Sequence, residues 1–129
     1  MSENKVLEHQ VSKKELHECL TILNRHYGIT VRIKTGYPES GLNSPCSEPI
    51  GGVLLFPPIN LFYNKYILAH EYAHVLALAP GIPALRWMNE HKAMWHDERF
   101  EKIYLQVCTV LGLAHVSTKE LRRSLRLEC

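Results

Sequence analysis

Apolar side chains recur at three- and four-residue intervals between Ser12 and Gly28, which is the spacing of one face of an α-helix. Ser12 and Glu15 form a capping box, and Val11 and Leu16 occupy the positions of a hydrophobic staple around it. Gly28 is typical of a residue that ends a helix. The pattern therefore predicts an amphipathic helix over this segment. Its apolar stripe consists of Leu16, Leu20, Leu23 and Tyr27.

After this helix the pattern changes to the two-residue period of a strand. Apolar and polar residues alternate over residues 29–34, which predicts a half-buried strand. A turn-rich loop follows over residues 36–49. Residues 51–56 are more apolar and predict a second, more buried strand that is closed by two prolines. This second strand is either an internal strand or an edge strand that can pair with an extended peptide.

The next helix is predicted to begin near Asn60 or Leu61 and to end at Pro80-Gly81. Residues 66–69 and 75–79, on either side of His70-Glu71-Tyr72-Ala73-His74, are apolar throughout. We therefore expect this helix to be buried on most sides. Polar, ionisable residues in such a helix need an explanation, because an ionisable group is costly to bury without a partner.

Helical periodicity returns towards the end of the chain. It predicts a long helix from about Asp97 to Leu111, stopped by Gly112, and a final helix within residues 116–129, opened by a capping box of Ser117 and Glu120. The two prolines of residues 80–88 predict a rigid loop that leads into a short helix. Together the elements predict an α+β fold: a leading helix, a short and mostly antiparallel sheet, a central helix and C-terminal helices.

The pair His70 and His74 has the spacing that places two imidazoles on one helical face, where they can bind one zinc ion. A catalytic zinc site has three protein ligands and one position for water, and Glu71 is placed to accept the proton of that water. The alternative is that both histidines are ordinary core residues held by hydrogen bonds. That alternative leaves Glu71 in an apolar helix without a role.

Several downstream residues are candidates for the third zinc ligand. His96 lies 22 positions after His74, where the long helix is expected to begin, and it is the favoured candidate. His91 is closer in sequence but lies in a less regular stretch. Glu98 or Glu101 are alternatives that would supply a carboxylate from the helix.

These residues resemble a known family. The motif His70-Glu71-Tyr72-Ala73-His74, together with His96 followed four residues later by Phe100, is similar to the pattern of SprT-like zinc metallopeptidase domains in the HExxH zincin group. The resemblance covers roughly residues 10–115, with Asp97 standing where the family usually has glycine. It implies a small zincin-like fold, His70, His74 and His96 as zinc ligands, and Glu71 as the general base.

Composition predicts one domain over residues 1–129, with a core of about residues 10–115 and a C-terminal helix over 116–129. With 46% hydrophobic residues, a chain of 129 residues can form a single core. A net charge of +2 favours neither nucleic acid nor membrane. No run is long and apolar enough to cross a bilayer, and the first residues lack the apolar region of a secretory signal, so a cytoplasmic location is expected.

The four cysteines are widely spaced and contain no Cys-x-x-Cys pair, which argues against a second, structural zinc site. Free thiols are expected without a secretory signal. Cys19 and Cys108 fall in amphipathic segments and are predicted to be core residues. Cys46 is predicted to lie in a loop, either as an ordinary cysteine or as an inhibitory zinc ligand.

The functional expectation is a zinc-dependent metallopeptidase that acts on a protein or peptide substrate, with no membrane partner. The alternative is a zincin-derived binding module with a structural zinc and no proteolytic activity. Such a module is expected to associate with a protein or with DNA. A weak association with nucleic acid through Arg122, Arg123 and Arg126 is a further expectation, although a solvated helix face explains these arginines as well.

Overall fold

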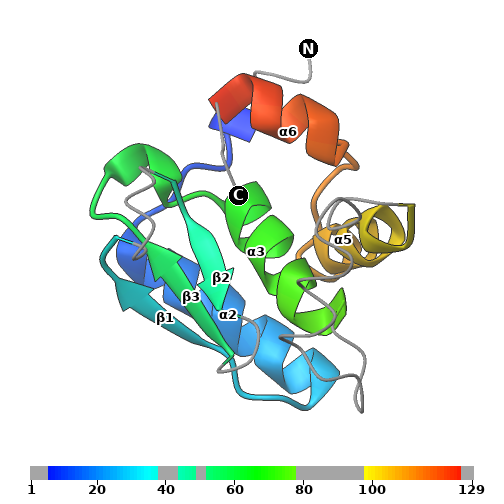
Figure 1. The fold of residues 1–129 in the computed structure, drawn as a ribbon, viewed down its shortest axis with the longest axis horizontal. Helices are drawn as coiled ribbons and strands as arrows, with labels where there is room; N and C mark the ends of the chain where they lie inside the picture. Colours follow the sequence, from blue (N-terminus) through cyan, green and yellow to red (C-terminus); the bar gives the residue numbers. More distant parts are fainter. Residues whose placement is uncertain (1–5, 38–43, 49–51, 78–97, 126–129) are drawn as a thin grey trace.

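The computed structural model describes residues 6–37, 44–48, 52–77 and 98–125. Within these ranges it confirms an α+β fold in which α3 is central, with the sheet and α2 on one side of it and α5 on the other (Figure 1). The final helix, α6, also contacts α3. In chain order the elements are α2 (Lys13–Tyr27), β1 (Arg32–Thr35), β2 (Cys46–Glu48), β3 (Val53–Phe56), the 3-10 helix η1 (Asn60–Phe62), α3 (Lys65–Ala77), α5 (Glu98–Val110) and α6 (Thr118–Leu125).

The predicted caps of α2 and α6 are present. The Ser12 hydroxyl accepts a hydrogen bond from the Glu15 backbone N–H at 3.1 Å, and the Ser117 hydroxyl accepts one from the Glu120 N–H at the same distance. Gly28 ends α2 with a φ of 68°, a left-handed conformation that glycine adopts without a Cβ clash. Local side-chain chemistry therefore sets these helix boundaries.

The central helix begins later than predicted. Residues 60–62 form η1 instead, and α3 starts at Lys65. Asn64 explains the boundary, because its side-chain oxygen accepts a hydrogen bond from the Tyr66 N–H at 2.8 Å. Its amide also donates to the Val6 carbonyl at 2.7 Å, which ties the helix start to the N-terminal segment. The predicted stop at Pro80-Gly81 lies outside the described residues, as do the loop and short helix predicted around residues 80–88.

The sheet differs from the prediction in its pairing. Its order is β1-β3-β2, with β1 parallel and β2 antiparallel to β3, so it is mixed rather than mostly antiparallel. The strand predicted over residues 51–56 is the central strand, and the alternative of an edge strand is wrong for it. The prediction missed β2, a three-residue strand inside a segment predicted as a loop, and therefore could not show that β3 has a partner on each side. A strand of three residues is too short to show a two-residue period.

One face of this sheet is turned towards the helices. Ile33 of β1 and Ser47 of β2 are both directly opposite Leu54 of β3, which is fully buried. Opposed side chains on neighbouring strands point to the same face. This face therefore presents Ile33, Leu54 and Ser47 to the interior, and Ser47 is its one polar member among these three.

Asn24 connects the end of α2, the start of β1 and α3. Its amide donates to the Val31 carbonyl at 3.0 Å, and its side-chain oxygen accepts from the Val31 N–H at 3.1 Å. The same oxygen accepts from the Tyr72 hydroxyl at 3.0 Å. Burial, with the nearby Tyr27, raises the pKa of Tyr72 to about 12, so the phenol keeps the proton that it donates.

We predict that Asn24→Ala lowers the free energy of unfolding by about 2–4 kcal/mol, because three hydrogen bonds disappear and two backbone groups lose their partner. The measurement is urea unfolding of the metal-free protein followed by circular dichroism. Thr21→Ala is the matched control, since this exposed hydroxyl bonds only to a carbonyl of its own helix. Equal stability of the two variants would contradict the connecting role of Asn24.

The cysteines fall into two groups. Cys19 and Cys108 are free and buried, as predicted. Cys46 is buried in β2 and disulfide-bonded, so the expectations of a free thiol, of a loop position and of a zinc-binding thiolate are wrong for this residue. Composition cannot show which cysteines the fold brings together, and a buried strand was not predicted at this position.

We predict that Cys108 makes stability fall at alkaline pH. Burial raises the pKa of its thiol from 9.0 to about 12, so above pH 9 the unfolded chain loses a proton that the folded chain keeps. The stabilisation is complete below pH 9 and is lost as the pH rises towards 12. Between pH 8 and 10.5, the free energy of unfolding should therefore fall by about 1–2 kcal/mol less in Cys108→Ala than in the wild type, as measured by urea unfolding. In the control Thr109→Ala, the free energy of unfolding should change with pH as in the wild type. The same pH dependence in Cys108→Ala would show that the Cys108 thiol is not its cause.

No helix in the described ranges has the length and apolar character needed to cross a membrane.

Candidate metal centre

His70, Glu71 and His74 lie together on α3, the central helix. Each offers one ligand atom, and these atoms lie within 4.8 Å of one another. His70 and Glu71 are fully buried, whereas His74 is partly exposed. The ring centroids of the two histidines are 4.9 Å apart, as the four-residue spacing predicts for neighbours on one helical face. The cluster therefore has a buried end and an end that reaches the surface.

His70 is held in the neutral form that a metal requires. Burial and, to a smaller extent, the positive charge of Arg122 lower its pKa to about 3, while Glu101 acts in the opposite direction. Its Nδ1 lies 2.9 Å from Oε2 of Glu71. In a neutral imidazole one ring nitrogen carries no proton, and its lone pair can bind a metal ion.

Glu71 is contacted from the sheet as well as from its own helix. The hydroxyl of Ser47, in β2, donates a hydrogen bond to Oε1 of Glu71 at 3.1 Å. The two carboxylate oxygens therefore face different neighbours, Ser47 on one side and the ring of His70 on the other. Sequence analysis did not identify Ser47, since the segment around it was predicted to be a loop.

Aromatic rings from α5 enclose both imidazoles. Phe100 stacks on His74 with centroids 4.4 Å apart and an angle of 27°, and meets His70 edge to face at 5.5 Å and 89°. Tyr104 lies one turn further along α5 and also meets His70 edge to face, at 6.1 Å. The Arg99 guanidinium donates to the Ala77 carbonyl at 2.7 Å, which fixes the start of α5 against the end of α3. Phe100, known from the sequence only as part of a motif, thus lies at the site.

The candidates for the third ligand separate into two groups. His96 and His91 lie outside the described residues. Glu98 is described, and its side chain is 89% exposed with Lys102 3.8 Å away. Glu101 accepts a hydrogen bond from the Thr118 N–H at 3.0 Å, at the start of α6. Neither glutamate belongs to the cluster on α3.

The arginines of the C-terminal helix do not share one environment. Arg122 is partly buried, with a buried Nε, and its charge acts on His70. Arg123 is exposed, and Arg126 lies outside the described residues. Binding of nucleic acid by these three residues stays a prediction.

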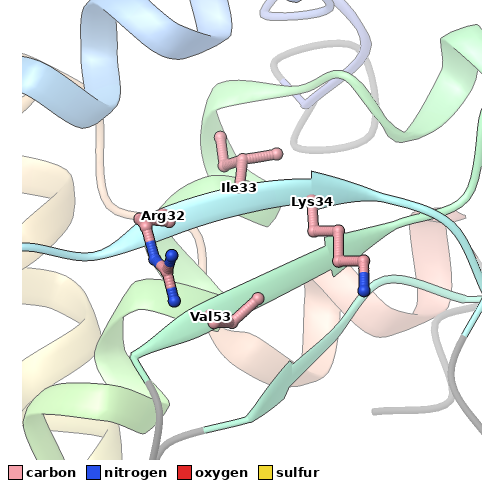
Figure 2. Close-up of a pocket in the computed structure, with 4 residues that line it drawn as sticks. All are labelled: Arg32, Ile33, Lys34 and Val53. Carbon is pink, nitrogen blue, oxygen red and sulfur yellow. The ribbon is translucent and has the colours of Figure 1, made fainter.

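A hollow of about 370 Å³ lies at the sheet, lined by Arg32, Ile33, Lys34 and Val53 (Figure 2). Arg32 and Lys34 project from one face of β1, and Ile33 projects from the other (Figure 2). The lining includes none of the residues of the cluster on α3. This basic hollow is therefore separate from the candidate metal centre.

Comparison with protein-family models, curated proteins and solved structures finds no match for this chain. The site must therefore be interpreted from its own geometry.

We predict that Phe100→Ala weakens both the fold and zinc binding by the candidate metal centre. Removing this buried ring should lower the free energy of unfolding of the metal-free protein by about 3–5 kcal/mol. Because the ring also holds His74, the zinc affinity of the folded variant should fall by about tenfold, measured by competition with a chromophoric chelator. Phe100→Leu is the matched control, since leucine fills more of the space than alanine does but has no flat ring. Wild-type zinc affinity in folded Phe100→Ala would contradict the role of the stack.

Proposed function

We propose that this protein is a zinc-dependent metallopeptidase that hydrolyses peptide bonds in a protein or peptide substrate. The observation that carries the proposal is the buried cluster of His70, Glu71 and His74 on one helix. Two imidazoles and a carboxylate are donor types that zinc binds in proteins. A buried carboxylate next to two histidines is costly in a purely structural role, and it has a clear use beside a metal ion.

His70 and His74 would hold the zinc ion, with His96 as the proposed third ligand. Support for His96 comes from sequence spacing, because it precedes Phe100 by four residues and Phe100 contacts both motif histidines. The two described alternatives are oriented elsewhere: Glu98 towards solvent and Glu101 towards the start of α6. When bound, zinc would lower the pKa of a coordinated water and polarise the scissile carbonyl.

Glu71 would be the general base. It would accept a proton from the attacking water and later transfer this proton to the leaving amine. Its position supports this role, since its carboxylate lies within the same cluster as the two imidazoles. The contact with Ser47 directs one oxygen towards the sheet, and the carboxylate keeps further lone pairs for a water.

The sheet offers a way to bind an extended substrate. β2 is an edge strand of the described sheet, and it contacts α3 directly. Backbone groups on an open strand edge can pair with a peptide whatever its side chains are. We therefore propose β2, rather than the strand over residues 51–56, as the strand that receives the substrate.

We predict that the purified protein binds one zinc ion per chain and cleaves fluorescently labelled casein. Zinc content by mass spectrometry should fall in His70→Ala, His74→Ala and His96→Ala and stay unchanged in His91→Ala and Glu98→Ala. Circular dichroism of each variant shows whether it is folded. Absence of zinc from the wild type, even after zinc is added, would contradict the proposal.

Glu71→Gln separates the enzyme from its alternative, the binding module. It should keep the zinc and lose at least about a hundredfold in casein cleavage, because general-base catalysis typically contributes 10²–10⁴-fold. A zinc-loaded wild type that cleaves nothing, and that unfolds when a chelator removes the zinc, would instead favour the binding module with a structural zinc.

A further inference from the structure

We propose that Ser47 is a positioning residue that holds the carboxylate of Glu71 in the orientation needed for proton transfer. This inference rests on the proposed function, because it assigns a partner to the proposed general base. It goes beyond the motif, since Ser47 lies 24 residues before Glu71 and on a different element. The contact between them is a direct hydrogen bond from the Ser47 hydroxyl to Oε1 of Glu71, at 3.1 Å.

The sheet register explains why Ser47 reaches the site. Ser47 pairs with Leu54, whose side chain is fully buried, so both side chains point to the interior face of the sheet. An apolar residue is the usual occupant of such a position. A serine there meets a buried carboxylate instead, on the strand that contacts α3. The serine at this interior position therefore provides a hydrogen-bond donor for the Glu71 carboxylate.

The geometry around Glu71 explains what the hydrogen bond does. A glutamate side chain has several rotatable bonds, and its last torsion has broad energy minima. The Ser47 hydroxyl holds Oε1, and Oε2 lies 2.9 Å from Nδ1 of the His70 ring. The hydrogen bond from Ser47 therefore restricts the plane of the carboxylate before a substrate arrives. A hydrogen bond to a charged acceptor is stronger than one between neutral groups, so Ser47 is well suited to this task.

The first test is cleavage of labelled casein by the zinc-loaded full chain. Ser47→Ala should lower kcat by about 10- to 100-fold, the range found when the partners that orient metal-site residues are removed. KM should change by less than about twofold, since the substrate contacts remain. Ser47→Thr should restore most of kcat because it keeps the hydroxyl. Ser124→Ala, which removes a serine that bonds only to a carbonyl of its own helix, should behave as the wild type.

The second test does not depend on activity. In the metal-free protein, unfolding is measured for Ser47→Ala, Glu71→Ala and the double variant. The two substitutions should be coupled by about tenfold in the unfolding equilibrium constant, the size expected of a buried hydrogen bond. In the Glu71→Gln background, Ser47→Ala should change the residual kcat by less than about twofold.

The outcomes distinguish the two proposals. A wild type without zinc or cleavage overturns the proposed function and the catalytic role of Ser47 with it, and the unfolding cycle then reports only whether the contact exists. An active wild type with Ser47→Ala unchanged in kcat overturns the positioning role alone. Equal losses in Ser47→Ala and Ser47→Thr overturn it too, because they would show that packing, not the hydroxyl, matters.

Discussion

The structure depends on the burial of a carboxylate in the middle of an apolar helix. Glu71 is fully buried on α3, between residues that are themselves buried. An ionised carboxylate in such a place is destabilising unless hydrogen bonds and nearby charges offset the loss of water. The fold supplies neighbours from two directions, Ser47 from the sheet and His70 from the same helix. A metal ion held by this group would add a positive charge beside the carboxylate.

This constraint also shapes the packing around α3. Every residue from Tyr66 to Ala73 is buried, so the helix has no solvated face over these two turns. A helix of this kind must be covered on all sides. The sheet with α2, α5 and α6 provide the cover, and each of these elements contacts α3. Phe100 and Tyr104 of α5 then lie against the two imidazoles, so the packing that buries α3 also restrains the candidate ligands.

The sequence predicted the features that local chemistry determines. The serine N-caps at Ser12 and Ser117 and the motif on a buried helix each depend on residues within one or two turns, and all are present. The start of α3 was predicted too early. Asn64 caps the helix locally through the Tyr66 N–H, but its second contact, with Val6, joins residues far apart in the chain and has no local signal. The role of Ser47 had no local signal at all, since it needs the pairing of β2 with β3 and the packing of both against α3.

The position of Ser47 joins the two halves of the proposed mechanism. β2 has only three residues and a single partner strand among the described elements, and it also packs against α3. On the proposed function, a substrate that pairs with its open edge adds backbone hydrogen bonds to this strand. Ser47 extends from the same strand to Glu71, and a more ordered strand places its hydroxyl more firmly on the carboxylate. Binding of the peptide and orientation of the general base would then both depend on the three residues of β2. On the proposed function, a short edge strand beside an apolar helix would connect substrate recognition to the chemistry.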